Sequence, residues 1–387
     1  MTETNEYDVI VVGVGGMGSA AAFNLAARGL KVLGLEQFTI GHENGSSGGH
    51  SRIIRSVYTE DPSYVPLVRR SFELWRELEQ RTGQSLLTMT GGLDIGTADG
   101  SLIQGSLAAC REHGIEHTLL TGAEVNRKFP AFSLPEDFVA VSYPEAGILK
   151  PEACVRAHCQ AARDLGATIR ENTAIDSIES SADRITVHTK DGQILHAKQL
   201  VVTAGAWIPK LFPEFKPAME PERQVVGWFE TAAPELFTSD RFPVFILREK
   251  EAAPGQDTTI GWYGFPSFNG DPMKFARYGH RKENVDADTL NRECTGKDRT
   301  VFGKLQPFFS AALGEPAMMK ACMFTNSPDH NFILGFHPQH DNIFIASPCS
   351  GHGFKFCPAI GEIIGDMLTT GESRHDISLH DIRRLSL

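Results

Sequence analysis

The sequence lacks any long hydrophobic run. No uninterrupted apolar stretch approaches the roughly 20 residues that a membrane-spanning helix needs. The first ten residues, MTETNEYDVI, have neither the basic start nor the apolar centre of a secretory signal. We therefore expect a cytoplasmic protein that does not associate with membranes.

Positive charge and paired cysteines are also scarce. Lys and Arg total 37 against 48 Asp and Glu, which gives a formal net charge of -11. A field of that sign repels phosphate backbones, so we expect no nucleic-acid partner. The seven Cys are scattered without a CxxC pair, which excludes the common zinc and dithiol motifs and fits a reducing cytoplasm.

The chain does contain the material for a large core. It has 387 residues, of which 41% are hydrophobic, and 24 of them are Phe. This is enough for two domains. No internal repeat, low-complexity tract or linker separates them, so we expect the two domains to be interleaved along the chain.

The first 36 residues have the pattern of a βαβ unit. Residues 7–12 form a β-branched apolar run, residues 13–18 (GVGGMG) form a glycine-rich turn, and residues 19–28 read as an Ala-rich helix. Residues 31–36 (KVLGLE) follow as a second strand that ends in an acid. This order predicts a dinucleotide-binding fold.

The glycine-rich turn predicts a phosphate site. Its glycines would let the backbone approach a pyrophosphate at the helix N-terminus, where free N–H groups favour negative charge. Glu36 lies 18 residues after Gly18, where its carboxylate can accept ribose hydroxyls of an adenine dinucleotide. The motif itself does not distinguish NAD from FAD.

Further elements follow from periodicity and from turn residues. Helices are expected at 69–82, 151–165 and 358–369, and strands at 88–95, 168–170, 184–188, 199–203 and 342–346. From residue 223 to about residue 274 the chain is rich in aromatics, Gly and Pro, with strand-like runs such as QVVGWFE and TIGWYGF. That block predicts antiparallel sheet.

Three further segments resemble the monomeric sarcosine oxidase family, which includes N-methyltryptophan oxidase and pipecolate oxidase. Residues 45–55 (GSSGGHSRIIR) resemble its flavin-face loop, and residues 322–329 (CMFTNSPD) resemble the segment with the flavin-linking cysteine. Residues 350–356 (SGHGFKF) resemble the loop that closes the substrate site. With residues 263–266 (YGFP) and Lys274 between them, the resemblance covers almost the whole chain.

The resemblance implies FAD as the cofactor. Residues 203–207 (TAGAW) are similar to the second dinucleotide signature of FAD-dependent amine oxidases and also favour FAD over NAD. The implied fold is α/β: a glutathione-reductase-like, Rossmann FAD-binding domain with an interleaved antiparallel-sheet substrate domain. We expect the first domain to comprise residues 1–87, 151–222 and 323–387, and the second to comprise residues 88–150 and 223–322.

The resemblance also implies roles for single residues around the flavin. Cys322 would form a covalent thioether to the flavin, with Cys349 and Cys357 as competitors for the link. Arg52 would face the isoalloxazine ring, and Lys274 would activate oxygen over the opposite face. The residues expected to bind FAD are Gly13, Gly15, Gly18, Glu36, Ser47, Ser51, Arg52, Cys322, Gly351, Gly353, Phe354 and Lys355.

On its substrate side, the implied site would bind a substrate that carries a carboxylate. Arg55 and Lys355 would bind a substrate carboxylate, since a guanidinium can pair bidentately while an ammonium adds a compact second charge. Arg55 lies three residues after Arg52, so a helical turn would place the two on neighbouring faces. Lys274, Arg52, Arg55 and Lys355 form the expected catalytic set, and the chemistry needs no metal ion.

Trp262, Phe324 and Gly351 are expected to wall the substrate. Sarcosine oxidases have tyrosines where this chain has Trp262 and Phe324, and an acid where it has His50, so the preferred substrate is open. Tyr278 and His280 are both candidates for the pocket, and His352 is a further candidate contact of the flavin.

We therefore predict a monomeric enzyme that acts on a small amino acid and O2. It would oxidise a small secondary amino acid, N-methyl or cyclic, to the imine, with O2 reduced to H2O2 and the imine hydrolysed in water. Sarcosine would yield glycine and formaldehyde. The alternatives are an N-methyltryptophan or pipecolate oxidase, an amino-acid dehydrogenase that passes electrons to a carrier, and a flavin-binding protein without turnover.

Overall fold

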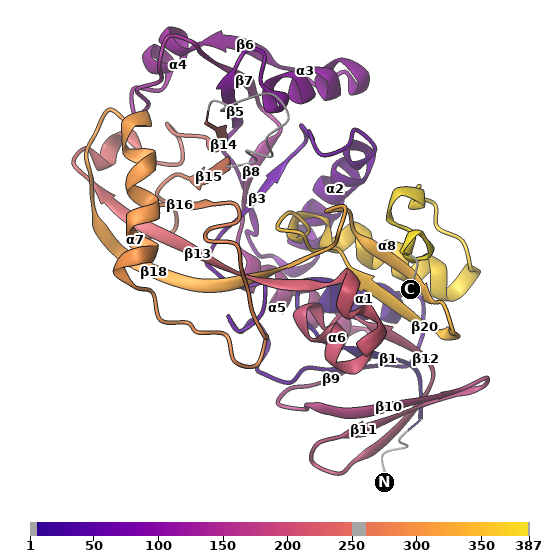
Figure 1. Ribbon diagram of the computed structural model, residues 1–387. Coiled ribbons are helices and arrows are strands. Elements are labelled where there is room, and N and C mark those ends of the chain that lie inside the picture. Colours follow the sequence, from indigo (N-terminus) through magenta and orange to yellow (C-terminus); the bar gives the residue numbers. More distant parts are fainter. Residues whose placement is uncertain (1–5, 250–260, 386–387) are drawn as a thin grey trace.

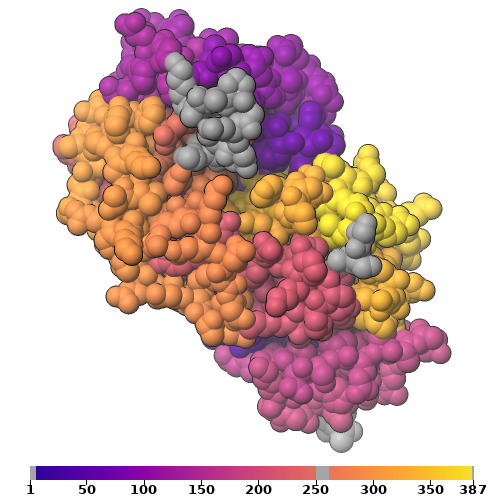
Figure 2. Space-filling view, in the orientation of Figure 1, coloured from indigo at the N-terminus to yellow at the C-terminus, as the bar shows by residue number. Residues whose placement is uncertain are grey.

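Two large β-sheets and a small one organise the chain (Figure 1). The computed structural model describes residues 6–249 and 261–385. Within these residues the sheets have eight, nine and three strands. Segments from distant parts of the sequence alternate across one face of the molecule (Figure 2), as expected for interleaved domains.

The eight-stranded sheet starts with the predicted βαβ unit: β1 (Glu6–Val12), α1 (Gly16–Ala27) and β2 (Val32–Leu35). The parallel core of this sheet runs in the order β9 (Thr168–Arg170), β2, β1, β12 (Ile194–Val202) and β20 (His340–Ser347). β19 (Ile333–His337) pairs antiparallel with β20. β10 (Ile175–Ser181) and β11 (Arg184–Thr189) form an antiparallel hairpin that extends from one end of the molecule (Figure 1).

The helices that cover this sheet pack closely because α1 carries small side chains. Ala20, Ala21 and Ala22 are fully buried, which lets α1 pack closely against both α5 (Pro151–Asp164) and α8 (Cys357–Thr370). The longer α2 (Tyr64–Thr82) packs against α5 and α8 in turn. The short α6 (Ile208–Leu211) follows β12 in the chain.

The nine-stranded sheet contains the aromatic block and is mixed. Its order is β17 (Glu283–Asn284), β13 (Glu220–Thr231), β16 (Met273–Arg277), β15 (Gly261–Phe265), β14 (Val244–Arg248), β5 (Gly92–Thr97), β7 (Phe138–Tyr143) and β6 (Thr118–Thr121), with β18 (Leu313–Asn326) also paired to β13. Its pairs are antiparallel except β14 with β5, which come from separate segments and are not joined by a hairpin. Within the block from residue 223 to about residue 274 the pairs of β13, β14, β15 and β16 are antiparallel, as predicted, and the parallel pair joins β14 to a strand outside that block.

Phenylalanines fill the space between this sheet and the helices around it. Phe132, Phe242, Phe245 and Phe309 are buried and in mutual ring contact. The helices of this part of the chain are α3 (Ser101–His113), α4 (Gly122–Lys128) and α7 (Gly296–Phe302).

The three-stranded sheet joins β3 (Arg52–Arg55) and β4 (Leu87–Met89) to β8 (Ala146–Leu149), which pairs antiparallel with both. The segment from Arg52 to Arg55 is thus a strand and not the expected helical turn. The strand expected at 88–95 is divided, because the chain turns at Gly91 (φ +71°) before β5 begins. Residues 259–260 of the TIGWYGF run lie outside the described residues.

The expected domain boundaries stay a proposal. The strands of the eight-stranded sheet come from residues 6–35, 168–202 and 333–347, and those of the nine-stranded sheet from residues 92–143, 220–284 and 313–326. β18 extends past the proposed boundary at residue 322. This alternation supports two interleaved units.

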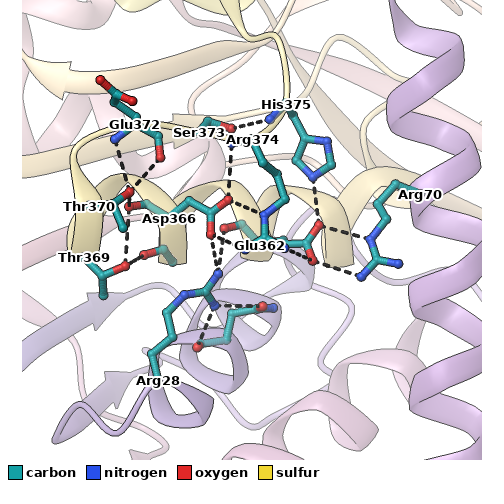
Figure 3. A network of polar contacts seen from close by, with 12 residues as sticks. Arg28, Arg70, Glu362, Asp366, Thr369, Thr370, Glu372, Ser373, Arg374 and His375 are labelled. Carbon is teal, nitrogen blue, oxygen red and sulfur yellow. Dashed lines mark hydrogen bonds and ion pairs between the residues drawn. The ribbon is translucent and has the colours of Figure 1, made fainter.

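A polar network fixes α8 to its neighbours (Figure 3). The carboxylates of Glu362 and Asp366 on α8 are buried and are its centre. Their charged partners are Arg70 from α2 (3.0 Å), Arg28 after α1 (2.6 Å), and Arg374 (2.7 Å) and His375 (2.8 Å) from the segment after α8. Because residues 350–356 lead directly into α8, this network holds the helix that follows that loop.

Candidate functional site

A cavity of about 460 Å³ brings the two halves of the predicted site together. It is lined by the glycine-rich turn and by the ends of β2 and β12. It is also lined by β15, by β18 and by residues 351–355. One cavity therefore contains both the expected dinucleotide turn and the expected substrate groups.

The glycine-rich turn is shaped by close backbone contacts. Gly13 has a φ of +86°, and a Cβ on Gly18 would overlap the Gly13 carbonyl oxygen and lie 2.6 Å from Thr203 Oγ1. By contrast, a Cβ on Gly15 would meet only Ser47 Oγ at 3.3 Å. Gly13 and Gly15 line the cavity, whereas Gly18 does not. Gly18 therefore serves packing, and the open space at Gly15 fits a pyrophosphate.

The start of α1 also suits an anion. The N-cap residue Gly15 has no side chain to cap this helix, and the Gly16 N–H instead donates to Ser47 Oγ of the neighbouring loop at 3.0 Å. The positive end of the helix dipole therefore faces the cavity wall formed by this turn. Ser47 lines the cavity, as predicted for a cofactor contact.

Glu36 lies at the end of β2 and is only 3% exposed. Its Oε2 accepts from the Val14 N–H at 2.9 Å, and its Oε1 accepts from the Phe38 N–H at 3.0 Å. The carboxylate also lines the cavity. Two backbone donors fix its orientation and leave lone pairs for ribose hydroxyls.

The loop of residues 45–52 surrounds the Arg52 guanidinium. Arg52 donates to the carbonyl oxygens of Ser51 (2.8 Å) and Ser46 (3.0 Å) and to that of Gly48. Ser46 Oγ donates to the Met323 carbonyl at 2.8 Å, which ties the loop to β18 beside Cys322. Arg52 lines the cavity at this junction.

Lys274 lies behind this loop. Its Nζ donates to the carbonyls of Gly49 (2.7 Å) and Ser51 (2.9 Å) and to Ser51 Oγ (3.1 Å). The side chain is 2% exposed and, like Ser51, is not among the cavity-lining residues. Burial, with the nearby Arg52 cation, lowers the pKa of Lys274 well below its ordinary value.

Cys322 and Phe324 share one face of β18, because side chains two apart on a strand point the same way. Both line the cavity, and so does Cys349. Cys357 does not line the cavity and is fully buried. Burial raises the pKa of the Cys322 thiol, and the Arg52 and Lys274 cations oppose that shift.

Arg55 is held by a carboxylate that sequence analysis missed. Its Nη2 donates to both Glu60 oxygens, at 2.9 and 3.0 Å, and its Nη1 donates to the Val57 carbonyl. Burial favours the neutral acid, but Arg55, His352 and Lys355 together outweigh it and lower the pKa of Glu60 below its ordinary value. The only sequence signal for this pair is an acid five residues after Arg55.

Lys355 is the second buried cation of the site. Its Nζ donates to the His352 carbonyl at 2.6 Å and to the Tyr58 hydroxyl at 3.1 Å. Burial and the Arg55 cation lower the pKa of Lys355 to about 7. The Tyr58 hydroxyl also lies 2.9 Å from His352 Nδ1. Tyr58 is therefore a further site residue that the sequence did not reveal.

The aromatic wall differs from the predicted one. Trp262 is fully buried on the opposite face of β15, where its Nε1 donates to Glu249 Oε1 at 2.7 Å and its ring packs against Phe275. Tyr263 lines the cavity in its place. The assignment of Trp262 to the substrate wall is therefore wrong by one residue, which in a strand is the other face.

The two other candidates for the pocket, Tyr278 and His280, differ in whether they line the cavity. Tyr278 lines the cavity, with its ring centroid 4.9 Å from that of Tyr263. His280 does not line it and instead has its Nε2 3.2 Å from Asp298 Oδ1. Gly351, with a φ of +80°, approaches Phe324 so closely that a Cβ would lie 2.7 Å from Cε2 of that ring. The remaining predicted contacts that line the cavity are His352, Gly353 and Phe354.

Among residues 6–249 and 261–385 no group of three His, Cys, Asp or Glu side chains is arranged to hold a metal ion. No helix in that part of the chain is both long and apolar enough to span a bilayer.

Comparison with known proteins gives consistent matches along the chain. The model of the family described as FAD dependent oxidoreductase matches residues 8–367. Monomeric sarcosine oxidase of Streptomyces avermitilis is 39% identical over 386 residues, which cover 98% of this chain and 98% of that protein. N-methyl-L-tryptophan oxidase of Yersinia pestis (strain Pestoides F) is 31% identical over 382 residues, which cover 98% of this chain and 99% of that protein.

A solved structure confirms the fold class. The open form of NikD, described as an unusual amino acid oxidase essential for nikkomycin biosynthesis, matches with a TM-score of 0.84 at 24% identity. The match covers 98% of each chain. The predicted α/β architecture is therefore confirmed.

Proposed function

Because this chain belongs to the FAD dependent oxidoreductase family and has monomeric sarcosine oxidases among its relatives, we propose that it oxidises a small secondary amino acid. The substrate loses a hydride from the carbon next to nitrogen and a proton, and becomes an imine that water hydrolyses. O2 takes up the two electrons and two protons and leaves as H2O2.

One observation carries the substrate class: two buried cations, Arg55 and Lys355, line the cavity and contact the same Tyr58 ring. Arg55 is paired with Glu60 and also interacts with the buried Asp94, whereas no ion pair in the described residues includes Lys355. A buried cation without an anionic partner is costly unless an anion enters. A substrate carboxylate supplies that anion and would be fixed at this end of the cavity.

The cavity residues fit FAD. The glycine-rich turn would hold the pyrophosphate, Glu36 the ribose, and Arg52 with residues 351–355 the isoalloxazine. Bound there, FAD supplies the electron acceptor for amine oxidation. Cys322 would carry the covalent link, since it lines the cavity and the Arg52 and Lys274 cations partly offset the rise in the pKa of its thiol that burial causes.

The covalent link has a direct test. After acid denaturation, flavin fluorescence should stay with the polypeptide of the native protein on a gel and disappear from Cys322→Ser. Fluorescence retained in that variant would contradict the assignment and move the link to Cys349, the other cysteine that lines the cavity.

Lys274 would promote the reaction with oxygen, because a fixed cation stabilises the negative charge that oxygen gains on reduction. This separates an oxidase from a dehydrogenase. Lys274→Met should lose oxygen reactivity and keep anaerobic flavin reduction by substrate. A variant that still reacts with oxygen at the native rate would contradict the role of Lys274.

Substrate choice is tested by anaerobic bleaching of the flavin. We expect sarcosine, N-methylalanine, proline and pipecolate to reduce it faster than N-methyltryptophan, because Tyr263, Tyr278 and Phe324 crowd the cavity. Faster reduction by N-methyltryptophan would favour the alternative oxidase. Reduction of the flavin by any amino acid of the series would exclude a flavin-binding protein without turnover.

We also propose that the enzyme is monomeric and works in the reducing cytoplasm. All seven cysteines lie in the described residues and are free thiols, which supports a reducing compartment. The mass of the enzyme in solution, measured by sedimentation, tests whether it is a monomer.

A further inference from the structure

The phenol of Tyr58 lies behind the two buried cations of the site, in the loop between β3 and α2. It is fully buried and is not among the cavity-lining residues. Its ring centroid is 4.5 Å from the Arg55 guanidinium carbon and 4.9 Å from the centroid of the Tyr64 ring, on which it stacks. These contacts fix the ring, so the place of the hydroxyl oxygen is fixed as well.

The hydroxyl proton of Tyr58 points toward His352. His352 Nε2 lies 3.0 Å from the His330 carbonyl, which only accepts, so Nε2 carries a proton. Burial lowers the pKa of His352 to about 4, so at neutral pH Nδ1 has no proton and is an acceptor. Nδ1 lies 2.9 Å from the Tyr58 oxygen, nearer than the His352 carbonyl at 3.4 Å. Burial also raises the pKa of Tyr58 well above its ordinary value, so the phenol keeps the proton that it donates to Nδ1.

The Tyr58 oxygen is therefore an acceptor for Lys355. Lys355 Nζ donates to it at 3.1 Å and to the His352 carbonyl at 2.6 Å. An ammonium has three protons to donate, and these two oxygens are the acceptors of Lys355 among the described residues. Because Lys355 lines the cavity, the third proton is left for an anion there.

The same oxygen stabilises the charge of Lys355. Burial and the Arg55 cation favour the neutral amine, whereas Glu60 and Cys357 favour the ammonium. A hydrogen bond to a charged group is stronger than one to a neutral group, so the Tyr58 oxygen also favours the ammonium. Removal of this oxygen should therefore lower the pKa of Lys355 below about 7.

We propose that Tyr58 is a positioning residue for Lys355: its hydroxyl orients the ammonium toward the substrate carboxylate and stabilises the positive charge. The inference rests on the proposed role of Lys355 in binding that carboxylate. Because Tyr58 does not line the cavity, its hydroxyl acts through Lys355 and not by contact with the substrate.

The test compares acetate binding to the native holoenzyme and to Tyr58→Phe. Phenylalanine keeps the ring beside Arg55 and Tyr64 and removes only the hydroxyl. Acetate is titrated by flavin absorbance from about pH 5.5 to about pH 9, where a carboxylate is ionised. In Tyr58→Phe, Lys355 should lose its charge at a pH lower by about 0.5 to 1. The two affinities should therefore be nearly equal at about pH 5.5 and differ about three- to tenfold at about pH 8.

Tyr64→Phe is the matched control. Tyr64 is fully buried and stacks on Tyr58, but its hydroxyl donates to Asn331 Oδ1 at 3.0 Å. The acetate profile of Tyr64→Phe should match the native one. An unchanged profile in Tyr58→Phe would overturn the inference. So would a loss of affinity that is equal at every pH, because it would mean that Tyr58 only supports the shape of the site.

The double variant Tyr58→Phe/Lys355→Met tests whether the hydroxyl acts through Lys355. Without the ammonium the hydroxyl has nothing to orient, so Tyr58→Phe should change the acetate affinity of Lys355→Met by less than about twofold at any pH. A loss in this background as large as that in the native background would show that Tyr58 acts independently of Lys355, and the inference would be wrong.

Lys355→Met also separates this inference from the proposed function. If Lys355→Met binds acetate as tightly as the native protein at about pH 6, the proposed role of Lys355 is wrong, and the inference about Tyr58 fails with it. If Lys355→Met binds acetate weakly while Tyr58→Phe keeps the native profile, only the inference about Tyr58 is wrong.

Discussion

At the scale of single residues, the proposed binding of a substrate carboxylate depends most on the buried Arg55 guanidinium. Its removal should weaken binding of an N-methyl amino acid well over tenfold, because losing one partner of a desolvated charge pair costs about 2–5 kcal/mol. The measurement is the concentration dependence of anaerobic flavin reduction in Arg55→Ala. The corresponding amine without the carboxylate should be hardly affected.

The matched control is Arg383→Ala, which removes an exposed guanidinium paired with Asp381 at the other end of the chain. It should bind the amino acid as the native protein does. Equal weakening of the amino acid and the simple amine in Arg55→Ala would mean that Arg55 supports the fold of the site and does not bind the carboxylate.

Lys355 gives the site a pH dependence of known sign. Its pKa of about 7 means that the ammonium is present below pH 7 and is lost above it. An anion binds the charged form, so affinity for a simple carboxylate should fall by up to about tenfold per pH unit above pH 7. Acetate titrations followed by flavin absorbance between about pH 6 and 9 check this. Lys355→Met should bind acetate weakly, with no such fall.

Single residues also mark the limit of sequence reasoning. The resemblance to the monomeric sarcosine oxidase family placed Arg55, Lys355, Cys322 and Phe324 at one site, and all four line the cavity. Trp262 was misassigned because a one-residue error in a strand exchanges its two faces. Glu60 was missed because a single acid after a strand carries no pattern.

At the scale of elements, the glycines of the turn before α1 should respond differently to the same substitution. Gly18→Ala introduces a Cβ that overlaps the Gly13 carbonyl, so the strand and helix must separate. Gly15→Ala meets only Ser47 Oγ and fills space on the cavity side. We expect Gly18→Ala to lower the melting temperature of the flavin-free protein, and Gly15→Ala to keep that temperature but lose flavin.

Thermal unfolding and the ratio of flavin to protein are the two measurements. Each variant is the control for the other, because both add one methyl group to the same turn. A Gly15→Ala protein with full flavin content would contradict the pyrophosphate assignment.

The network on α8 should contribute stability that depends on pH. Burial opposes ionisation of Glu362, but His375 and Arg70 outweigh it and lower its pKa from 4.5 to about 2. A depressed folded pKa gives stability that is complete above the unfolded value and is lost as the pH falls through the folded one. Glu362→Gln should therefore lower the free energy of unfolding at pH 7 by about 1–3 kcal/mol.

The difference between native protein and Glu362→Gln should shrink below pH 4.5, the unfolded value, as Glu362 protonates. Denaturant titrations at several pH values follow it. Glu73→Gln is the control, because Glu73 pairs with the same Arg70 at 2.7 Å but has a 63% exposed side chain. A loss in Glu73→Gln equal to that in Glu362→Gln would contradict a role for burial.

At the scale of the whole molecule, local pattern predicted the elements better than it predicted their partners. The first βαβ unit, β9 and α8 lie where periodicity placed them, because their apolar faces and glycine turns are local signals. The parallel pair of β14 with β5 and the three-stranded sheet join distant segments. Such pairings depend on the complete tertiary arrangement, which the local pattern does not contain.

The order in which the chain is synthesised sets the order in which the walls of the cavity become available. Its walls begin at Val12 and end at Lys355, and the segments between them contribute in turn. α8 follows Lys355 directly and supplies the buried carboxylates of its polar network, Glu362 and Asp366. The nascent chain therefore cannot assemble a complete flavin pocket until Lys355 has been synthesised, and cofactor loading must wait for the last of these walls.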